Sequence, residues 1–243
     1  INIDKINRTG IFKGKKKKKI NITINDVKKI INDNLADDSK IHSKSEIGII
    51  NGLYATTNGD GGIIPIQIFK NFTPSNEKHE IKLTGNQGDV MKESVQCALT
   101  TALDYIRKNV KKYKFIKNLD DYLQENFKYG FHVHAPSTST PKDGPSAGGA
   151  FTTAFISRIL NKKIKNYVGM TGEIELTGRI TKIGGLTYKL FGAKRAGVKL
   201  VYIPNENKKD LKDIKQKNQN LIDKNFKVVC FENISEIIDD ILE

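Results

Sequence analysis

Ser146 and Lys189 are the two residues of this chain whose surroundings best predict chemistry. Ser146 lies in the segment Pro-Lys-Asp-Gly-Pro-Ser-Ala-Gly-Gly at 141–149, and Lys189 follows Gly-Gly-Leu-Thr-Tyr at 184–188. A serine hydroxyl is a poor nucleophile until a neighbouring group removes its proton. A lysine can do this when burial keeps its amine neutral. Together the two segments predict cleavage of amide bonds by a serine nucleophile and a lysine base.

The segment around Ser146 predicts a sharp turn that leads into a helix. Gly144 and Pro145 would form the turn, and proline is well suited to the first turn of a helix. Free backbone N–H groups at such a start can stabilise a tetrahedral oxyanion. We expect those around Gly144 to Ser146 to do so. The alternatives are a glycine-rich helix start that only packs tightly, or one that binds phosphate.

Lys189 has apolar neighbours, Leu186 and Leu190, so one side of its helix is expected to face the core. A lone lysine in such a place usually extends to water, so the catalytic interpretation depends on the Ser146 segment. His132 and His134 alternate with a valine and would share one face of a strand. As a pair they indicate a structural or hydrogen-bonding role more than a catalytic one.

Composition predicts one large domain with a small appendage. Hydrophobic residues make up 37% and charged residues 28% of 243 residues, and no apolar run is long enough to span a membrane. The net charge of +14 comes mainly from lysine, which we interpret as solvated surface. Lys15–Lys19 is either a flexible loop or linker, or a contact for an anion or a nucleic acid. Cys97 and Cys230 lack metal-type spacing and are expected to be buried free thiols, as in a reducing compartment.

Hydrophobic periodicity and turn residues predict a mixed α/β (α+β) sandwich and not a doubly wound nucleotide fold. Asn58 to Gly62 should be a tight turn, and Pro65 suggests that its strand lies at a sheet edge. Strands are predicted at 46–57, 63–69, 80–84, 131–134, 199–204 and 228–231, with further strands and turns over 167–185. Helices are predicted at 88–110, 118–127, 187–196, 210–217 and 234–242, with another that starts at 145 or 146.

The first 45 residues differ from the rest. A short strand at 22–24 and a helix at 26–34, capped by Asn25, precede a polar linker at 36–45. We place the domain boundary there, with residues 1–45 as an appendage and 46–243 as the main domain. The chain begins with Ile1 and has no secretory signal, so we expect it to be a fragment of a longer protein.

Several segments, in this order and spacing, resemble the proteolytic domain of the Lon family of ATP-dependent serine proteases, also called endopeptidase La. The resemblance covers about residues 46–243 and looks more like mitochondrial than bacterial members. The matching segments are Gly85–Ser94, His132–His134, Thr140–Gly148, Met170–Glu173, Leu176–Gly178, Ile183–Leu186 with Lys189, and Ala193–Val198.

The resemblance implies roles for individual residues. Ser146 matches the family's catalytic serine, Lys189 its catalytic lysine, and Thr171 the threonine that contacts the lysine. Asp143 matches an aspartate that occludes the resting site in some members. The paired histidines of the family match His132 and His134, which would lie near the site without acting as the base.

Two departures from the family pattern affect the substrate groove. The first hairpin fits only loosely, and a family acidic residue would fall near Asn58, so that role is not carried over. Thr187 and Tyr188 replace a commoner charged pair before Lys189.

The resemblance also implies a fold, partners and a cellular place. The fold would be the Lon proteolytic-domain fold, a ribosomal-protein-S5-domain-2-like β-α sandwich, with residues 1–45 as a remnant of the AAA+ helical subdomain plus linker. The fragment would need no metal or cofactor, whereas ATP and Mg²⁺ would serve the full-length protein through an AAA+ module that these residues lack. Partners would be unfolded or damaged proteins, peptides, five further copies in a homo-hexamer and, weakly, DNA, with no membrane. The location would be the mitochondrial matrix or, alternatively, a bacterial-type cytoplasm.

Two other classes of protein compete with this interpretation. A small-molecule kinase of the homoserine and galactose type has a related fold and a similar loop, which would hold ATP phosphates and give Lys189 no required role. A non-enzymatic basic module would use Lys15–Lys19 and the overall charge to bind nucleic acid. Nucleotide binding would distinguish the first, and salt-sensitive DNA binding without peptidase activity the second.

Overall fold

The computed structural model describes Thr23 and residues 39–74, 80–136 and 143–243. The chain divides into two units, Ile1–Asp37 and Asp38–Glu243, and the described helices and strands all belong to the second. The strand predicted at 22–24, the helix predicted at 26–34 and Lys15–Lys19 lie outside the described residues, apart from Thr23. The described part of the predicted linker is attached to the body, because Ile41 N–H donates to the Ala196 carbonyl.

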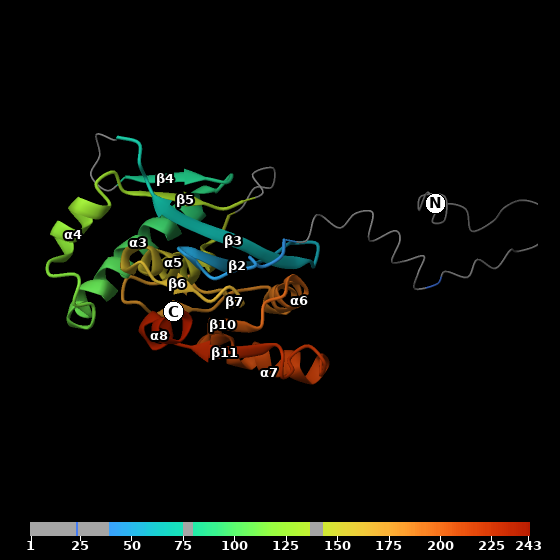
Figure 1. Ribbon diagram of the computed structural model, residues 1–243. Helices are drawn as coiled ribbons and strands as arrows, with labels where there is room; N and C mark the ends of the chain where they lie inside the picture. The colour runs from blue at the N-terminus through green and yellow to red at the C-terminus, as the bar shows by residue number, and fades with distance from the viewer. Residues whose placement is uncertain (1–22, 24–38, 75–79, 137–142) are drawn as a thin grey trace, which may run out of the picture. The chain divides into compact units, whose positions relative to one another are not determined.

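A seven-stranded mixed sheet forms the centre of the domain (Figure 1), in the order β11-β10-β7-β2-β3-β5-β4. β3 is antiparallel to both β2 and β5, whereas the other neighbours in the sheet are parallel. Two short antiparallel pairs, β1–β6 and β8–β9, lie outside it. The strands are β1 (Glu46–Ile47), β2 (Ile49–Ala55), β3 (Gly61–Lys70), β4 (Ile81–Thr84), β5 (Phe131–His134), β6 (Lys163–Ile164), β7 (Val168–Met170), β8 (Glu173–Ile174), β9 (Ile180–Thr181), β10 (Leu200–Pro204) and β11 (Lys227–Phe231).

Helices cover the sheet on both faces, which confirms the predicted mixed α/β sandwich. α3 and α5 pack together against one face, and α6 packs against β2 and β3 from the other. In the described part of the chain, none of the helices is long and apolar enough to cross a membrane. The α-helices are α3 (Asp89–Lys108), α4 (Leu119–Asn126), α5 (Gly148–Leu160), α6 (Leu186–Ala196), α7 (Lys208–Lys217) and α8 (Ile238–Ile241), with 3₁₀ turns at Val110–Lys112, Pro145–Ala147, Asn205–Asn207 and Ile234–Glu236.

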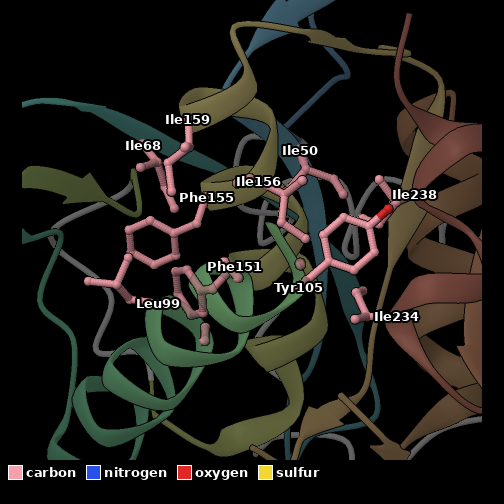
Figure 2. Close-up of a cluster of buried hydrophobic side chains, with 14 of the residues drawn as sticks. Ile50, Ile68, Leu99, Tyr105, Phe151, Phe155, Ile156, Ile159, Ile234 and Ile238 are labelled. Carbon is pink, nitrogen blue, oxygen red and sulfur yellow. The ribbon is translucent and has the colours of Figure 1, made fainter. Parts of the chain in front are cut away.

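The alternation of side chains along β2 separates two hydrophobic cores. Ile50 faces the core of α3 and α5, whereas Leu53 faces the core of α6 and α7. The first core is rich in aromatic rings (Figure 2), and the Phe131 and Phe155 rings meet edge to face at 5.2 Å. Ring pairs of this kind stabilise a core beyond the apolar area that they bury. β2 is therefore held between two packed layers.

The helix signals in the sequence are largely confirmed. The predicted apolar stripe of α3, from Met91 to Tyr105, is buried. Asn118 caps α4 by accepting hydrogen bonds from the N–H groups of Asp120 and Asp121. Gly197 ends α6 at φ +96°, a conformation that glycine adopts without strain.

Three predicted elements are interrupted. Gly48, at φ +71°, separates β1 from β2 within the strand predicted at 46–57. The helix predicted from Pro145 begins with a 3₁₀ turn before α5. The last helix has the predicted capping box at Asn233 and Glu236, but its 3₁₀ turn breaks at Ile237 before α8. Short helix ends commonly tighten to 3₁₀ geometry, and sequence periodicity does not distinguish it.

The sheet-edge position inferred from Pro65 is wrong for β3 as a whole, although Pro65 itself has a neighbouring strand on one side only. β3 lies between β2 and β5. However, β5 pairs only with Gln67–Lys70, so Pro65 has one strand partner, Asn51 of β2. Because proline has no N–H group, it needs one side of its strand without inter-strand hydrogen bonds. A short neighbouring strand leaves such a side free, as a sheet edge does.

Replacing Gly192 with alanine should destabilise the domain, because α6 meets β3 there without room for a side chain. A Cβ atom on Gly192 would lie 2.2 Å from the Gly61 carbonyl group. Gly192→Ala should lower the free energy of unfolding by about 1–3 kcal/mol, the usual effect of overpacking. Urea unfolding measures this. Gly184→Ala is the control, because its Cβ meets nothing within 4 Å; equal effects of the two would contradict the packing.

Candidate active site

The residues between β7 and β8 bind the turn that carries Ser146. Gly172 N–H donates to the Ser146 carbonyl at 2.7 Å, and Gly149 N–H donates to the Gly172 carbonyl at 3.0 Å. Gly148 packs closely here, since a Cβ on it would lie 2.6 Å from Ile174 Cγ2. The small residues that follow Ser146 therefore let neighbouring segments approach closely.

Lys189 points from α6 into this turn and meets the serine. Its side chain is 4% exposed, with Nζ 2.8 Å from Ser146 Oγ and 2.9 Å from Thr171 Oγ1. None of the carboxylates in the described part of the chain forms an ion pair with it. Burial therefore acts unopposed and lowers the pKa of Lys189 to about 8. The structure brings the sequence-predicted serine, lysine and threonine together.

Thr171 helps to orient the amine of Lys189. Its hydroxyl donates to the Ser146 carbonyl at 3.1 Å, so its oxygen can only accept from Lys189 Nζ. A neutral amine has two N–H groups and one lone pair. With one N–H directed to Thr171, the amine can still turn its lone pair towards the hydroxyl proton of Ser146. This is the arrangement that a general base requires.

Two contacts position α6 so that Lys189 reaches the turn. α6 starts directly after Gly185, which has φ +68°, and packs on β3 through Gly192. Just before the helix, Ile183 exchanges two hydrogen bonds with the side chain of Asn207, which is fully buried. The buried amide therefore fixes the start of the helix. Nothing in the sequence pattern singled out Asn207, whose position after Pro204 resembles an ordinary loop.

Asp143 is bound to the start of α3. Its Oδ1 accepts from Met91 N–H and from Gly144 N–H, each at 2.9 Å. A carboxylate at a helix N-terminus is favoured by the helix dipole. The sequence did not predict this contact, although it predicted a helix that starts at residue 88.

These contacts reduce the number of backbone N–H groups that can serve the oxyanion hole predicted around Gly144 to Ser146. Pro145 has no N–H group, and Gly144 uses its own on Asp143. Ser146 is left as the donor within the predicted set. Gly144 has φ +114°, and a Cβ added to it would meet no atom of the described residues within 4 Å, so these residues leave the space beside the turn open.

His132 and His134 belong to a separate cluster on the β4–β5 pair. Thr84 Oγ1 lies 2.9 Å from His132 Nε2 and 2.7 Å from His134 Nδ1. Burial, Lys82 and His134, in that order, lower the pKa of His132. Because one hydroxyl joins both rings, they support each other structurally, as the sequence suggested. The register that places Thr84 opposite His134 could not be read from the sequence.

Cys97 and Cys230 are free thiols, as predicted, but each is half-buried instead of fully buried. Cys97 Sγ donates to the Ile174 carbonyl next to the Ser146 turn. Among the residues that the structure describes, no group of three or more His, Cys, Asp or Glu side chains is placed to hold a metal ion.

Comparison with known proteins finds the same family throughout. The family model described as the Lon protease (S16) C-terminal proteolytic domain matches residues 21–243. A Lon protease homolog from Acanthamoeba polyphaga mimivirus is 52% identical over 204 residues, which is 83% of this chain and 19% of that protein. The Lon protease of Trichlorobacter lovleyi is 43% identical over 200 residues, 82% of this chain and 22% of its own. That of Clostridium acetobutylicum is 37% identical over 232 residues, 94% and 27% respectively. The chain thus spans well under a third of each relative's length.

The protonation state of the Lys189 amine should control any reaction at Ser146. The protonated amine cannot accept a proton, so activity should be low below the pKa of about 8 and rise through it to a plateau at alkaline pH. The logarithm of kcat/KM for a short peptide, plotted against pH, measures this. A midpoint near 6.5, the ordinary pKa of histidine, would contradict the lysine as base.

Proposed function

Since this chain belongs to the Lon protease C-terminal proteolytic-domain family, which is a family of serine endopeptidases, we propose that it cleaves peptide bonds with Ser146 as nucleophile and Lys189 as base. The observation that carries this assignment is the 2.8 Å approach of a buried amine to Ser146 Oγ. The amine has a lowered pKa and no carboxylate partner among the described residues. Both features are needed for a lysine to act as a base near neutral pH.

The reaction starts with proton transfer from Ser146 Oγ to the neutral Nζ of Lys189. Oγ attacks the carbonyl carbon of the substrate, and the tetrahedral oxyanion is stabilised by the Ser146 N–H. Lys189 then gives the proton to the departing amine as the C–N bond breaks, which leaves an ester on Ser146. A water molecule, deprotonated by Lys189, attacks the ester and releases the acid, and the proton returns to Oγ. Thr171 keeps Nζ in place throughout.

The kinase alternative fits this arrangement poorly. It gives Lys189 no required role, yet the structure buries that amine against Ser146 and Thr171. The helix start also has few free donors for a phosphate, since Pro145 has no N–H, Gly144 N–H donates to Asp143 and Gly149 N–H donates to the Gly172 carbonyl. The basic-module alternative is based on the overall charge of +14 and on Lys15–Lys19, which lie outside the described residues.

The activity of the whole protein is a wider proposal, based on the resemblance and on the names of the relatives. We infer that this domain degrades unfolded or damaged proteins as part of a homo-hexamer, driven by ATP and Mg²⁺ bound to an AAA+ module beyond these residues. The 243-residue chain should then cleave short peptides at a rate that ATP does not change. If ATP with Mg²⁺ stimulated peptide cleavage by the isolated chain, the assignment of ATP binding to a separate AAA+ module would be wrong.

The location and weak DNA binding are likewise proposals. The mitochondrial matrix is proposed because Leu176–Gly178 and Ala193–Gly197 look more like mitochondrial members, and a bacterial-type cytoplasm is the alternative. Fractionation of source cells tests the location, and a gel-shift titration at two salt concentrations tests the binding of DNA. The peptidase proposal holds whatever these show.

Removing either partner of the pair should abolish cleavage without unfolding the chain. Ser146→Ala and Lys189→Met should each lower kcat/KM by at least about 10³-fold, because each removes a group that acts on the transferred proton. Lys194→Met is the matched control, since Lys194 lies on the same helix and binds Asp223 instead. Circular dichroism checks the fold, and mass spectrometry after a serine-directed covalent inhibitor should find the label on Ser146. Label on another serine, or full activity of either variant, would refute the assignment.

A further inference from the structure

α7 and β11, with the turn between them, carry a cluster of exposed lysines at one edge of the sheet. Lys208, Lys212 and Lys215 are spaced so that they form one stripe along α7, while Leu211 and Ile214 hold the other side of the helix in the core. We call this cluster the α7–β11 lysine surface. Its members are Lys208, Lys209, Lys212, Lys215, Lys217, Lys224 and Lys227.

The charge of this surface is not neutralised by its own acidic residues. Glu206 binds Arg179, Asp210 binds Lys182 and Asp223 binds Lys194, so these carboxylates compensate cations outside the surface. Of the seven lysines, none takes part in an ion pair within the described parts of the chain. Asp213 of α7 is also exposed and adds one negative charge, so the surface keeps a net positive charge that attracts polyanions.

β11 adds an open strand edge to the charge. It is the last strand of the described sheet and pairs with β10 alone (Figure 1). Lys227 N–H donates towards β10, to the Lys199 carbonyl. Since backbone groups alternate in direction along a parallel strand, the N–H and C=O groups of Val228 and Cys230 point away from β10. Val229, between them, is 40% exposed.

The stripe of lysines lies beside this open edge. Burial raises the pKa of the Cys230 thiol, and the charges of Lys208 and Lys215 act in the opposite direction. These two amines are therefore near enough to influence a thiol in the middle of β11. An extended segment along the edge would run under them.

The residues that follow β11 connect its open edge to the candidate active site. Just beyond β11, the Glu232 carbonyl accepts from Ile180 N–H of β9. β9 pairs with β8, and Gly172, next to β8, holds the Ser146 carbonyl. A chain bound along β11 would thus be directed to the hairpin that borders the serine.

We propose that the α7–β11 lysine surface docks acidic, extended segments of polypeptide substrates, an inference that rests on the proposed peptidase function. The lysines match acidic side chains, and the outward backbone groups of β11 match an added strand. A polypeptide uses both features, whereas a nucleic acid has no backbone ladder to pair with a strand. This is why a polypeptide partner is favoured over DNA.

Two peptides with the same cleavable core test the proposal, one flanked by glutamates and the other by glutamines. The 243-residue chain should show a lower KM for the glutamate peptide, and 0.5 M salt should remove the difference because it screens exposed charges. The triple variant Lys208→Glu, Lys212→Glu, Lys215→Glu should bind the glutamate peptide less well. The KM of the glutamate peptide divided by that of the glutamine peptide should rise about tenfold, since three weak exposed contacts are reversed together. Lys111→Glu, Lys114→Glu, Lys117→Glu is the control, with the same charge change on exposed lysines elsewhere; it should leave the ratio as it is.

Several outcomes would overturn the proposal. Equal KM values for the two peptides would show that the lysines only protect a sheet edge from pairing. An equal effect of the control triple would show a general effect of net charge. Tighter binding of duplex DNA than of the glutamate peptide, lost in the α7 triple, would assign the surface to nucleic acid. A changed sedimentation coefficient of the α7 triple would assign it to contact between copies of this chain.

The test separates docking from catalysis. Fluorescence anisotropy of the labelled glutamate peptide with the Ser146→Ala chain measures binding without cleavage. If neither peptide is cut by the unmodified chain, the peptidase proposal fails, and anisotropy still decides whether acidic peptides bind here.

Discussion

Burial of the Lys189 amine without a carboxylate beside it is the constraint on which the rest of the site depends. A shift from the ordinary value of 10.5 to about 8 corresponds to roughly 3 kcal/mol, since each pKa unit is about 1.4 kcal/mol. Because the folded pKa is below the unfolded one, this cost is fully present below pH 8 and disappears above pH 10.5. The same free energy that destabilises the ammonium ion makes the amine available as a base. A carboxylate within reach would stabilise the ammonium and remove the function.

The surrounding architecture tolerates this cost and gives the amine its direction. α6 lies so close to β3 that Gly192 and Gly61 touch through their backbones, which limits the freedom of the helix that carries Lys189. On the opposite side, Gly172 and Thr171 bind the carbonyl of Ser146. Serine and lysine therefore come from helices on opposite faces of the sheet and meet at the end of β7. Family membership explains why this arrangement is present, and the contacts explain why it can work.

The sequence predicted the residues of the site better than their surroundings. Glycine, proline and the apolar periodicity located α3, α4 and α6 well, because capping by Asn118 and Gly197 depends on local contacts. Pairing over long distances could not be predicted: the central place of β3 follows from the short reach of β5, which no local pattern encodes. The contact between Asp143 and Met91 and the buried amide of Asn207 depend likewise on tertiary structure. The predicted oxyanion donors were too many, since the use of Gly144 N–H by Asp143 is visible only in three dimensions.

Direct titration of Lys189 Nζ by heteronuclear NMR tests the central claim without reference to any reaction. With lysine labelled in its side chain and Lys189→Met used to assign the signal, the chemical shift should follow a single midpoint near pH 8. A midpoint near pH 10.4, the ordinary value of a lysine side chain, would show that burial does not lower the pKa of this amine and that the site, as described, cannot activate its serine.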